Sequence, residues 1–102
     1  MNIIITDKER KIITDVLSAV LPDDVKVYVF GSRAKGTSKK YADLDIALKS
    51  EESISQSLLD NLNIRFEESL LPYKVDIIDL NNIDKDFYNE IESDLIPFLF
   101  NC

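Results

Sequence analysis

The sequence contains no histidine, and this absence removes several common forms of enzyme chemistry. Triads of serine, histidine and aspartate, pairs of cysteine and histidine, and histidine general bases are all excluded. The commonest zinc sites also need histidine or several cysteines. Any chemistry of this chain must therefore depend on carboxylates, lysines, hydroxyl groups, backbone amides and hard metal ions.

Cysteine and long apolar segments are equally scarce. The one cysteine, Cys102, cannot form a disulfide within the chain, which is typical of an intracellular protein. No apolar run has the length needed to cross a bilayer. The first residues lack the charged start and the cleavage site of a secretory signal. From these features we expect a complete, cytoplasmic protein without membrane association.

Basic residues are outnumbered, because 12 Lys and Arg stand against 19 Asp and Glu, for a formal net charge of −7. A nucleic-acid backbone needs a basic surface, so direct binding of nucleic acid is not expected. The basic residues include a short cluster of Arg33, Lys35, Lys39 and Lys40. A local basic cluster in an acidic protein suits a small polyanion better than a long duplex.

The length of 102 residues suits one compact domain, residues 1–102. Apolar spacing, capping signals and prolines predict, in order, a helix from Thr6 to Pro22, a strand at 25–30, a helical turn at 32–35, a strand at 43–48, a helix that Ser53 caps and Pro72 closes, a strand at 73–80, and a helix that Asp84 caps and Pro97 stops. This order indicates an α/β (α+β) fold, a small mixed sheet with helices packed on it. The apolar helix stripes, which include Leu70 and Phe87, are predicted to be core.

Two aspartates in the second predicted strand are the first candidate site residues. Side chains alternate along a strand, so Asp43 and Asp45 project from the same face, with Cα atoms about 6.5–7 Å apart. Two carboxylates this close repel each other unless a cation lies between them. Because oxygen ligands favour a hard ion, the pair predicts a Mg²⁺ site.

A glycine and a serine at the end of the first predicted strand supply the second half of the pattern. Gly31 permits a tight turn, and Ser32 offers a hydroxyl and exposed amides at a helix start, which together suit terminal phosphates. If the strands at 43–48 and 73–80 are neighbours, Asp76 completes a cluster of three carboxylates. Each feature alone is also common as a turn or a solvated face, so the hypothesis rests on their combination.

This combination resembles the nucleotidyltransferase superfamily related to DNA polymerase beta, and especially its minimal nucleotidyltransferases. The resemblance covers nearly the whole chain. The family commonly has a serine before Asp-x-Asp, whereas this chain has Ala42. The matching segments are Val29-Phe30-Gly31-Ser32-Arg33-Ala34-Lys35-Gly36, Tyr41-Ala42-Asp43-Leu44-Asp45-Ile46-Ala47-Leu48 and Lys74-Val75-Asp76-Ile77-Ile78.

The resemblance implies a role for each candidate residue. Asp43 and Asp45 would bind two Mg²⁺ ions, for which Mn²⁺ could substitute. Asp76 would bind the catalytic ion and help to deprotonate the attacking hydroxyl. Ser32 and the amides near Gly31 would hold the β- and γ-phosphates of ATP. Arg33 would contact a phosphate or the acceptor, and no role follows for Lys35.

The resemblance also implies a partner. Minimal members are typically encoded beside a helical HEPN-family toxin, commonly a ribonuclease, and neutralise it by transferring AMP to a tyrosine. Two alternatives stay open: an antitoxin that blocks its partner by contact without catalysis, and a nucleotidyltransferase that modifies a small molecule such as an aminoglycoside antibiotic. Assembly as a homo-oligomer or a hetero-oligomer is also open. Residues 98–100, Phe-Leu-Phe, would either dock the partner or pack on the domain's own sheet.

Overall fold

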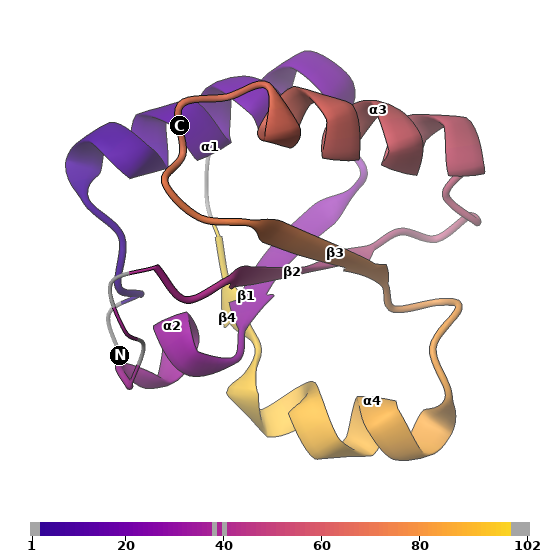
Figure 1. The fold of residues 1–102 in the computed structure, drawn as a ribbon. Helices are drawn as coiled ribbons and strands as arrows, with labels where there is room; N and C mark the ends of the chain where they lie inside the picture. The colour runs from indigo at the N-terminus through magenta and orange to yellow at the C-terminus, as the bar shows by residue number, and fades with distance from the viewer. Residues whose placement is uncertain (1–2, 38, 40, 99–102) are drawn as a thin grey trace.

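The computed structural model describes residues 3–37, 39 and 41–98. Four strands form one mixed sheet in the order β3-β2-β1-β4, with α1 and α3 on one face and α4 on the other (Figure 1). The predicted small mixed sheet with packed helices is therefore confirmed. The elements are α1 (Asp7–Val20), β1 (Lys26–Phe30), α2 (Ser32–Lys35), β2 (Leu44–Lys49), α3 (Gln56–Glu67), β3 (Val75–Asp79), α4 (Lys85–Ile91), a 3-10 turn (Glu92–Asp94) and β4 (Ile96–Pro97).

The first helix begins where the capping box predicts it. The Thr6 hydroxyl accepts a hydrogen bond from the Glu9 amide, and the Glu9 carboxylate accepts one from the Thr6 amide, both at 3.1 Å. These two bonds satisfy amide groups that a helix start otherwise leaves without partners. Ile13 and Leu17 then lie on the buried face of α1.

The central strand β2 explains the layering of the fold. It pairs antiparallel with β1 and parallel with β3. Leu44, Ile46 and Leu48 are fully buried in the main core cluster, which also contains residues of α1 and α3. Ala47 belongs to a second, smaller cluster with Ile91 of α4. Residues of β2 therefore alternate between two apolar layers.

Several predicted boundaries shift by one or two residues. The strand predicted at 43–48 begins at Leu44, so Asp43 lies just before it. The third helix is capped by Ser55 rather than Ser53, since the Ser55 hydroxyl accepts a hydrogen bond from the Leu58 amide at 3.2 Å. The strand predicted at 73–80 covers residues 75–79. Asp84 caps α4 as predicted.

Two apolar residues that were predicted to be core are exposed, and one strand was not predicted. Leu70 is 84% exposed because α3 ends at Glu67, so Leu70 does not continue the helical stripe. Phe87, in the helix α4, is 37% exposed. The two-residue strand β4 pairs antiparallel with β1, and Phe98 beyond it is buried against the main core. The other two residues of the predicted 98–100 segment, Leu99 and Phe100, lie outside the described residues.

Among the described residues, no helix combines the length and the apolarity needed to cross a membrane.

Candidate active site

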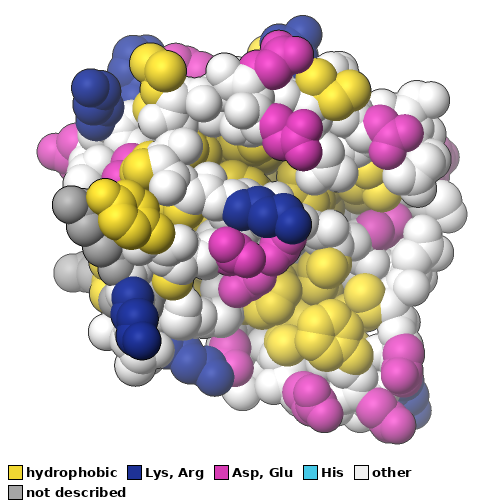
Figure 2. Space-filling view, in the orientation of Figure 1, with side chains coloured by type: hydrophobic (Ala, Val, Ile, Leu, Met, Phe, Trp, Pro, Cys, Tyr) yellow, Lys and Arg dark blue, Asp and Glu magenta, His cyan; other side chains and the backbone are white. Residues whose placement is uncertain are grey.

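The sheet register brings the candidate carboxylates together. Asp45 lies opposite Phe30 of β1 on one side and opposite Asp76 of β3 on the other. Neighbouring strands lie about 4.8 Å apart, so Asp45 and Asp76 occupy adjacent positions on the sheet. The predicted neighbourhood of the two strands is therefore confirmed. Acidic side chains gather near the centre of the face seen in Figure 2, and a hydrophobic surface borders them.

The glycine turn packs directly against Asp45, one member of this pair. Gly31 has a positive φ of 76°, a conformation that side chains disfavour. A Cβ atom at this position would overlap Oδ2 of Asp45 and would lie 3.1 Å from its Cγ. Gly31 therefore allows the carboxylate to reach the backbone of the turn. Ser32 begins α2 directly after Gly31, so the first turn of that helix follows the residue that packs against Asp45.

The carboxylate of Asp45 stands in an unfavourable electrostatic environment. Burial raises the pKa of Asp45, and the negative charges of Asp76 and Asp43 raise it further. The ionised carboxylate is therefore disfavoured where it stands. A cation beside it would relieve this cost, so the electrostatics of the site suit a positively charged ligand.

The side chain of Asp76 is partly open to solvent. Its side chain is 47% exposed, and its Oδ1 lies 4.0 Å from Nζ of Lys74, which is itself largely exposed. An exposed pair at this distance contributes little to stability, because solvent screens it. The carboxylate of Asp76 is therefore accessible to a ligand.

The oxygen-only donor set fits a hard ion, although it is not a closed cage. Within residues 3–37, 39 and 41–98, no three acidic or sulfur- or histidine-bearing side chains are grouped as a metal-binding set. Mg²⁺ commonly takes one or two carboxylates and completes its octahedron with water and substrate phosphates. The open arrangement of Asp45 and Asp76 beside the glycine turn therefore suits an ion that arrives together with a phosphate.

Arg33 is buried inside the fold, where the resemblance had implied a contact with a phosphate or the acceptor. The residue is only 3% exposed. Nε donates to the carbonyl of Ala42 at 2.9 Å, and Nη1 donates to the carbonyl of Ile4 at 2.8 Å. The guanidinium also lies 3.7 Å from the ring centroid of Tyr73. Arg33 therefore links the turn at Gly31 to the segment that leads into Asp43.

Tyr73 and Glu9 extend this connection to the first helix. The Tyr73 hydroxyl donates to Oε1 of Glu9 at 3.0 Å, and Glu9 is also part of the capping box. Burial, and then the bond and charge of Glu9, raise the pKa of Tyr73 well above its ordinary value. Tyr73 therefore stays protonated and acts as a donor. The sequence holds no signal for this network, because its members are far apart along the chain.

The basic segment does not form a uniform patch. Arg33 is buried, and Nζ of Lys35 lies 3.3 Å from Oδ2 of Asp94. Lys39 is exposed, and Lys40 lies outside the described residues. Among the described residues, the predicted basic cluster is therefore not one exposed surface.

A glycine turn lies beside one of two carboxylates on adjacent strands, an arrangement that suits a nucleotide and a divalent ion. Comparison with known proteins agrees with this description. The family model described as polymerase beta nucleotidyltransferase matches residues 11–97. A probable protein adenylyltransferase of Haemophilus influenzae, MntA, is 42% identical over 83 residues, which cover 81% of this chain and 72% of that protein.

Solved structures share the fold at lower identity. A chain from a crystal structure of a toxin–antitoxin complex with AMP-PNP superposes with a TM-score of 0.70 at 21% identity, over 86% of this chain and 70% of that one. A chain from the structure of a tri-AMPylated Shewanella oneidensis HEPN toxin in complex with an MNT antitoxin superposes with a TM-score of 0.64 at 19% identity, over 86% of this chain and 66% of that one. The chain belongs to the polymerase beta nucleotidyltransferase family.

The raised pKa of Asp45 yields a prediction about stability. In EDTA at neutral pH, Asp45→Asn should increase the free energy of unfolding, because it removes a charge that burial and like charges disfavour. A raised folded-state pKa gives stability that is present below the ordinary value of 3.8 and is lost as pH rises through the folded value. The gain should therefore shrink as the pH falls. Urea unfolding across this range measures it.

The matched control for this experiment is Asp24→Asn, which alters an exposed carboxylate at the other end of the sheet and should leave stability almost unchanged. A variant Asp45→Asn that is less stable than the wild-type protein at neutral pH would contradict the electrostatic account of the site.

The buried position of Arg33 yields a second prediction. Arg33→Lys keeps the charge but cannot serve both carbonyls and the Tyr73 ring, so it should lower the free energy of unfolding by about 1–3 kcal/mol. Arg65→Lys, on the exposed face of α3, should change it by less than about 0.5 kcal/mol. Unchanged stability together with weakened ATP binding in Arg33→Lys would instead assign Arg33 to phosphate contact.

Proposed function

We propose that this protein transfers AMP from ATP to a hydroxyl, preferably that of a tyrosine, on a helical HEPN-type toxin, and thereby acts as its antitoxin. Family membership and the adenylyltransferase relative support this activity. The observation that carries the proposal is the packing of the Gly31 turn against Asp45, which lies opposite Asp76. This arrangement supports a phosphate site next to carboxylates that can serve a metal and a hydroxyl.

In this proposal each residue acts on one part of ATP. Ser32 and the first amides of α2 bind the β- and γ-phosphates, as helix starts bind anions generally. Asp43 and Asp45 hold Mg²⁺, or Mn²⁺ in its place, and two such ions fit the expected reaction. The metal supplies charge neutralisation of the phosphates.

Asp76 serves the acceptor. The acceptor oxygen attacks the α-phosphorus, its bond to the hydrogen breaks, and Asp76 takes the proton. The bond between the α-phosphorus and its bridging oxygen to the β-phosphate breaks, and pyrophosphate leaves. The half-exposed position of Asp76, on the strand next to Asp45, supports this assignment. ATP is available in the cytoplasm, so we place the reaction there.

Intact-mass measurement tests the proposed transfer. Co-expression with the helical protein encoded by the adjacent gene should add one or more AMP units to that protein, and none when Asp43→Asn replaces the wild-type chain. The expected cause is loss of metal and triphosphate binding. A tight complex with an unmodified partner, neutralised equally by Asp43→Asn, would establish the antitoxin that acts by contact alone. Labelling of an aminoglycoside and not of the partner would establish small-molecule transfer.

Asp76→Asn separates binding from chemistry. Because a general base acts on the reacting hydroxyl, its removal should lower the transfer rate by about 10²-fold or more. ATP affinity in the presence of Mg²⁺ should change little, which calorimetry measures. Asp24→Asn again serves as the control. Wild-type activity in Asp76→Asn would remove this residue from the mechanism.

A further inference from the structure

We propose that the outer edge of β3, with the pocket between β3 and α3, binds an extended segment of the acceptor protein and so delivers its hydroxyl to Asp76. This inference rests on the proposed function and specifies how that function selects its substrate. It requires a pocket and a strand edge, both of which are present among the described residues, and a direction of approach, which the order of the site residues implies.

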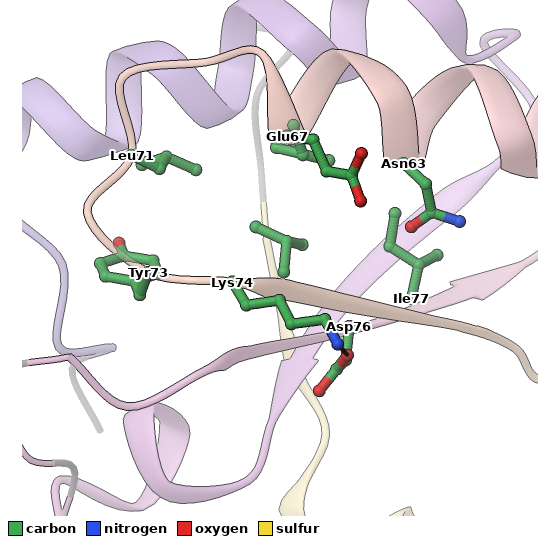
Figure 3. A pocket seen from close by; sticks show the side chains of 9 residues that line it. Asn63, Glu67, Leu71, Tyr73, Lys74, Asp76 and Ile77 are labelled. Atoms are coloured by element: carbon green, nitrogen blue, oxygen red, sulfur yellow. Dashed lines mark ion pairs between the residues drawn. The ribbon is translucent and has the colours of Figure 1, made fainter.

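The pocket opens beside the candidate active site. It has a volume of about 620 Å³ and lies between the C-terminal half of α3 and the strand β3 (Figure 3). Its lining combines apolar side chains with polar and charged groups, a mixture that can take a side chain and fix its orientation. The side chains that matter here are those of Asn63, Glu67, Leu71, Tyr73, Asp76 and Ile77.

The strand β3 is the outermost strand of the sheet on this side, since within the described residues it pairs only with β2. The carbonyl of Lys74 accepts from the Leu44 amide, and the Leu80 amide donates to the Leu48 carbonyl, both at 2.9 Å. Backbone groups alternate direction along a strand, so those of Val75 and Ile77 point away from β2. They can pair with another extended segment, as in other cases of strand addition.

The order of the site residues across the sheet sets the direction of approach. The turn at Gly31 follows β1, Asp45 lies on β2 in the middle, and Asp76 lies on β3. In an in-line displacement the attacking and leaving oxygens lie on opposite sides of the phosphorus. If pyrophosphate leaves toward the turn at Gly31, the acceptor hydroxyl must enter from the side of β3.

An extended segment at this edge would use both faces of the sheet at once. Neighbouring residues of a strand point to opposite faces. The hydroxyl-bearing residue would lie on the face of Asp76, and the residue next to it would enter the pocket, where Leu71 and Ile77 favour an apolar side chain. The carboxylate of Glu67 at the rim and the net charge of −7 favour basic residues in the segment.

The second large pocket does not offer an alternative for this role. It is lined by Asp24, Lys26 and Lys49, among others. Lys26 begins β1 and Lys49 ends β2, whereas the candidate site lies at the other ends of these strands. An acceptor bound there would be separated from Asp76 by the length of the sheet.

Filling the pocket tests the inference. Asn63→Phe places an aromatic ring at the pocket rim of α3, and Asn61→Phe makes the same change on α3 outside the pocket. We expect Asn63→Phe to lower kcat/KM for AMP transfer to the co-purified helical partner at least about tenfold, which corresponds to 1.4 kcal/mol. ATP affinity should match the wild-type protein, and Asn61→Phe should transfer normally. Equal transfer by the two variants would overturn the proposal.

Amide signals of the labelled protein supply a second readout that does not depend on a variant. Addition of the partner should shift the amides of Val75 and Ile77 and slow their hydrogen exchange. Transfer to the partner with both amides unaffected would overturn the proposed docking and leave the proposed function intact. A wild-type protein that binds ATP but modifies no residue of the partner would instead overturn the proposed function.

Discussion

Burial of the central strand β2 is the constraint on which the rest of the structure depends. Leu44, Ile46 and Leu48 are fully buried beneath the two long helices, and this burial fixes the register of β2. Alternation then forces Asp45 onto the opposite face. The same register sets Asp45 between the end of β1 and Asp76 of β3. A shift of one residue would bury the carboxylate in the core, so core packing and site geometry are specified together.

Asp45 and Arg33, two charged residues near the candidate site, differ in how well the surrounding structure stabilises their charges. The pKa of Asp45 is raised by burial and by its acidic neighbours, so the ionised carboxylate is unfavourable and a cation beside it would be stabilising. Arg33 is the opposite case, because backbone carbonyls and the ring of Tyr73 satisfy it within the fold. This buried network fixes the position of the turn at Gly31 relative to the segment that leads into Asp43. Buried contacts therefore fix the backbone around the candidate site, whereas the negative charge of Asp45 is disfavoured.

The sequence was enough to predict the main helices and strands and the adjacency of Asp45 and Asp76, since the apolar residues around each aspartate indicate a strand. It could not predict the role of Arg33. The bond from Arg33 to Ile4 spans 29 positions, and no local pattern encodes it. The exposure of Phe87 and the cap at Ser55 were missed for a related reason. Apolar spacing and serine caps mark helices, but tertiary packing decides which residue is used.

The central claim is that the turn at 31–33, the Asp43–Asp45 segment and Asp76 form one site for a metal and a triphosphate. Paramagnetic broadening of backbone amide signals by Mn²⁺, in the presence of a non-hydrolysable ATP analogue, tests this claim most directly. The account predicts that the strongest broadening lies at residues 31–33, 43–45 and 76, and that Mg²⁺ in excess reverses it. Broadening centred on the acidic segment 84–94, with these residues unaffected, would contradict it.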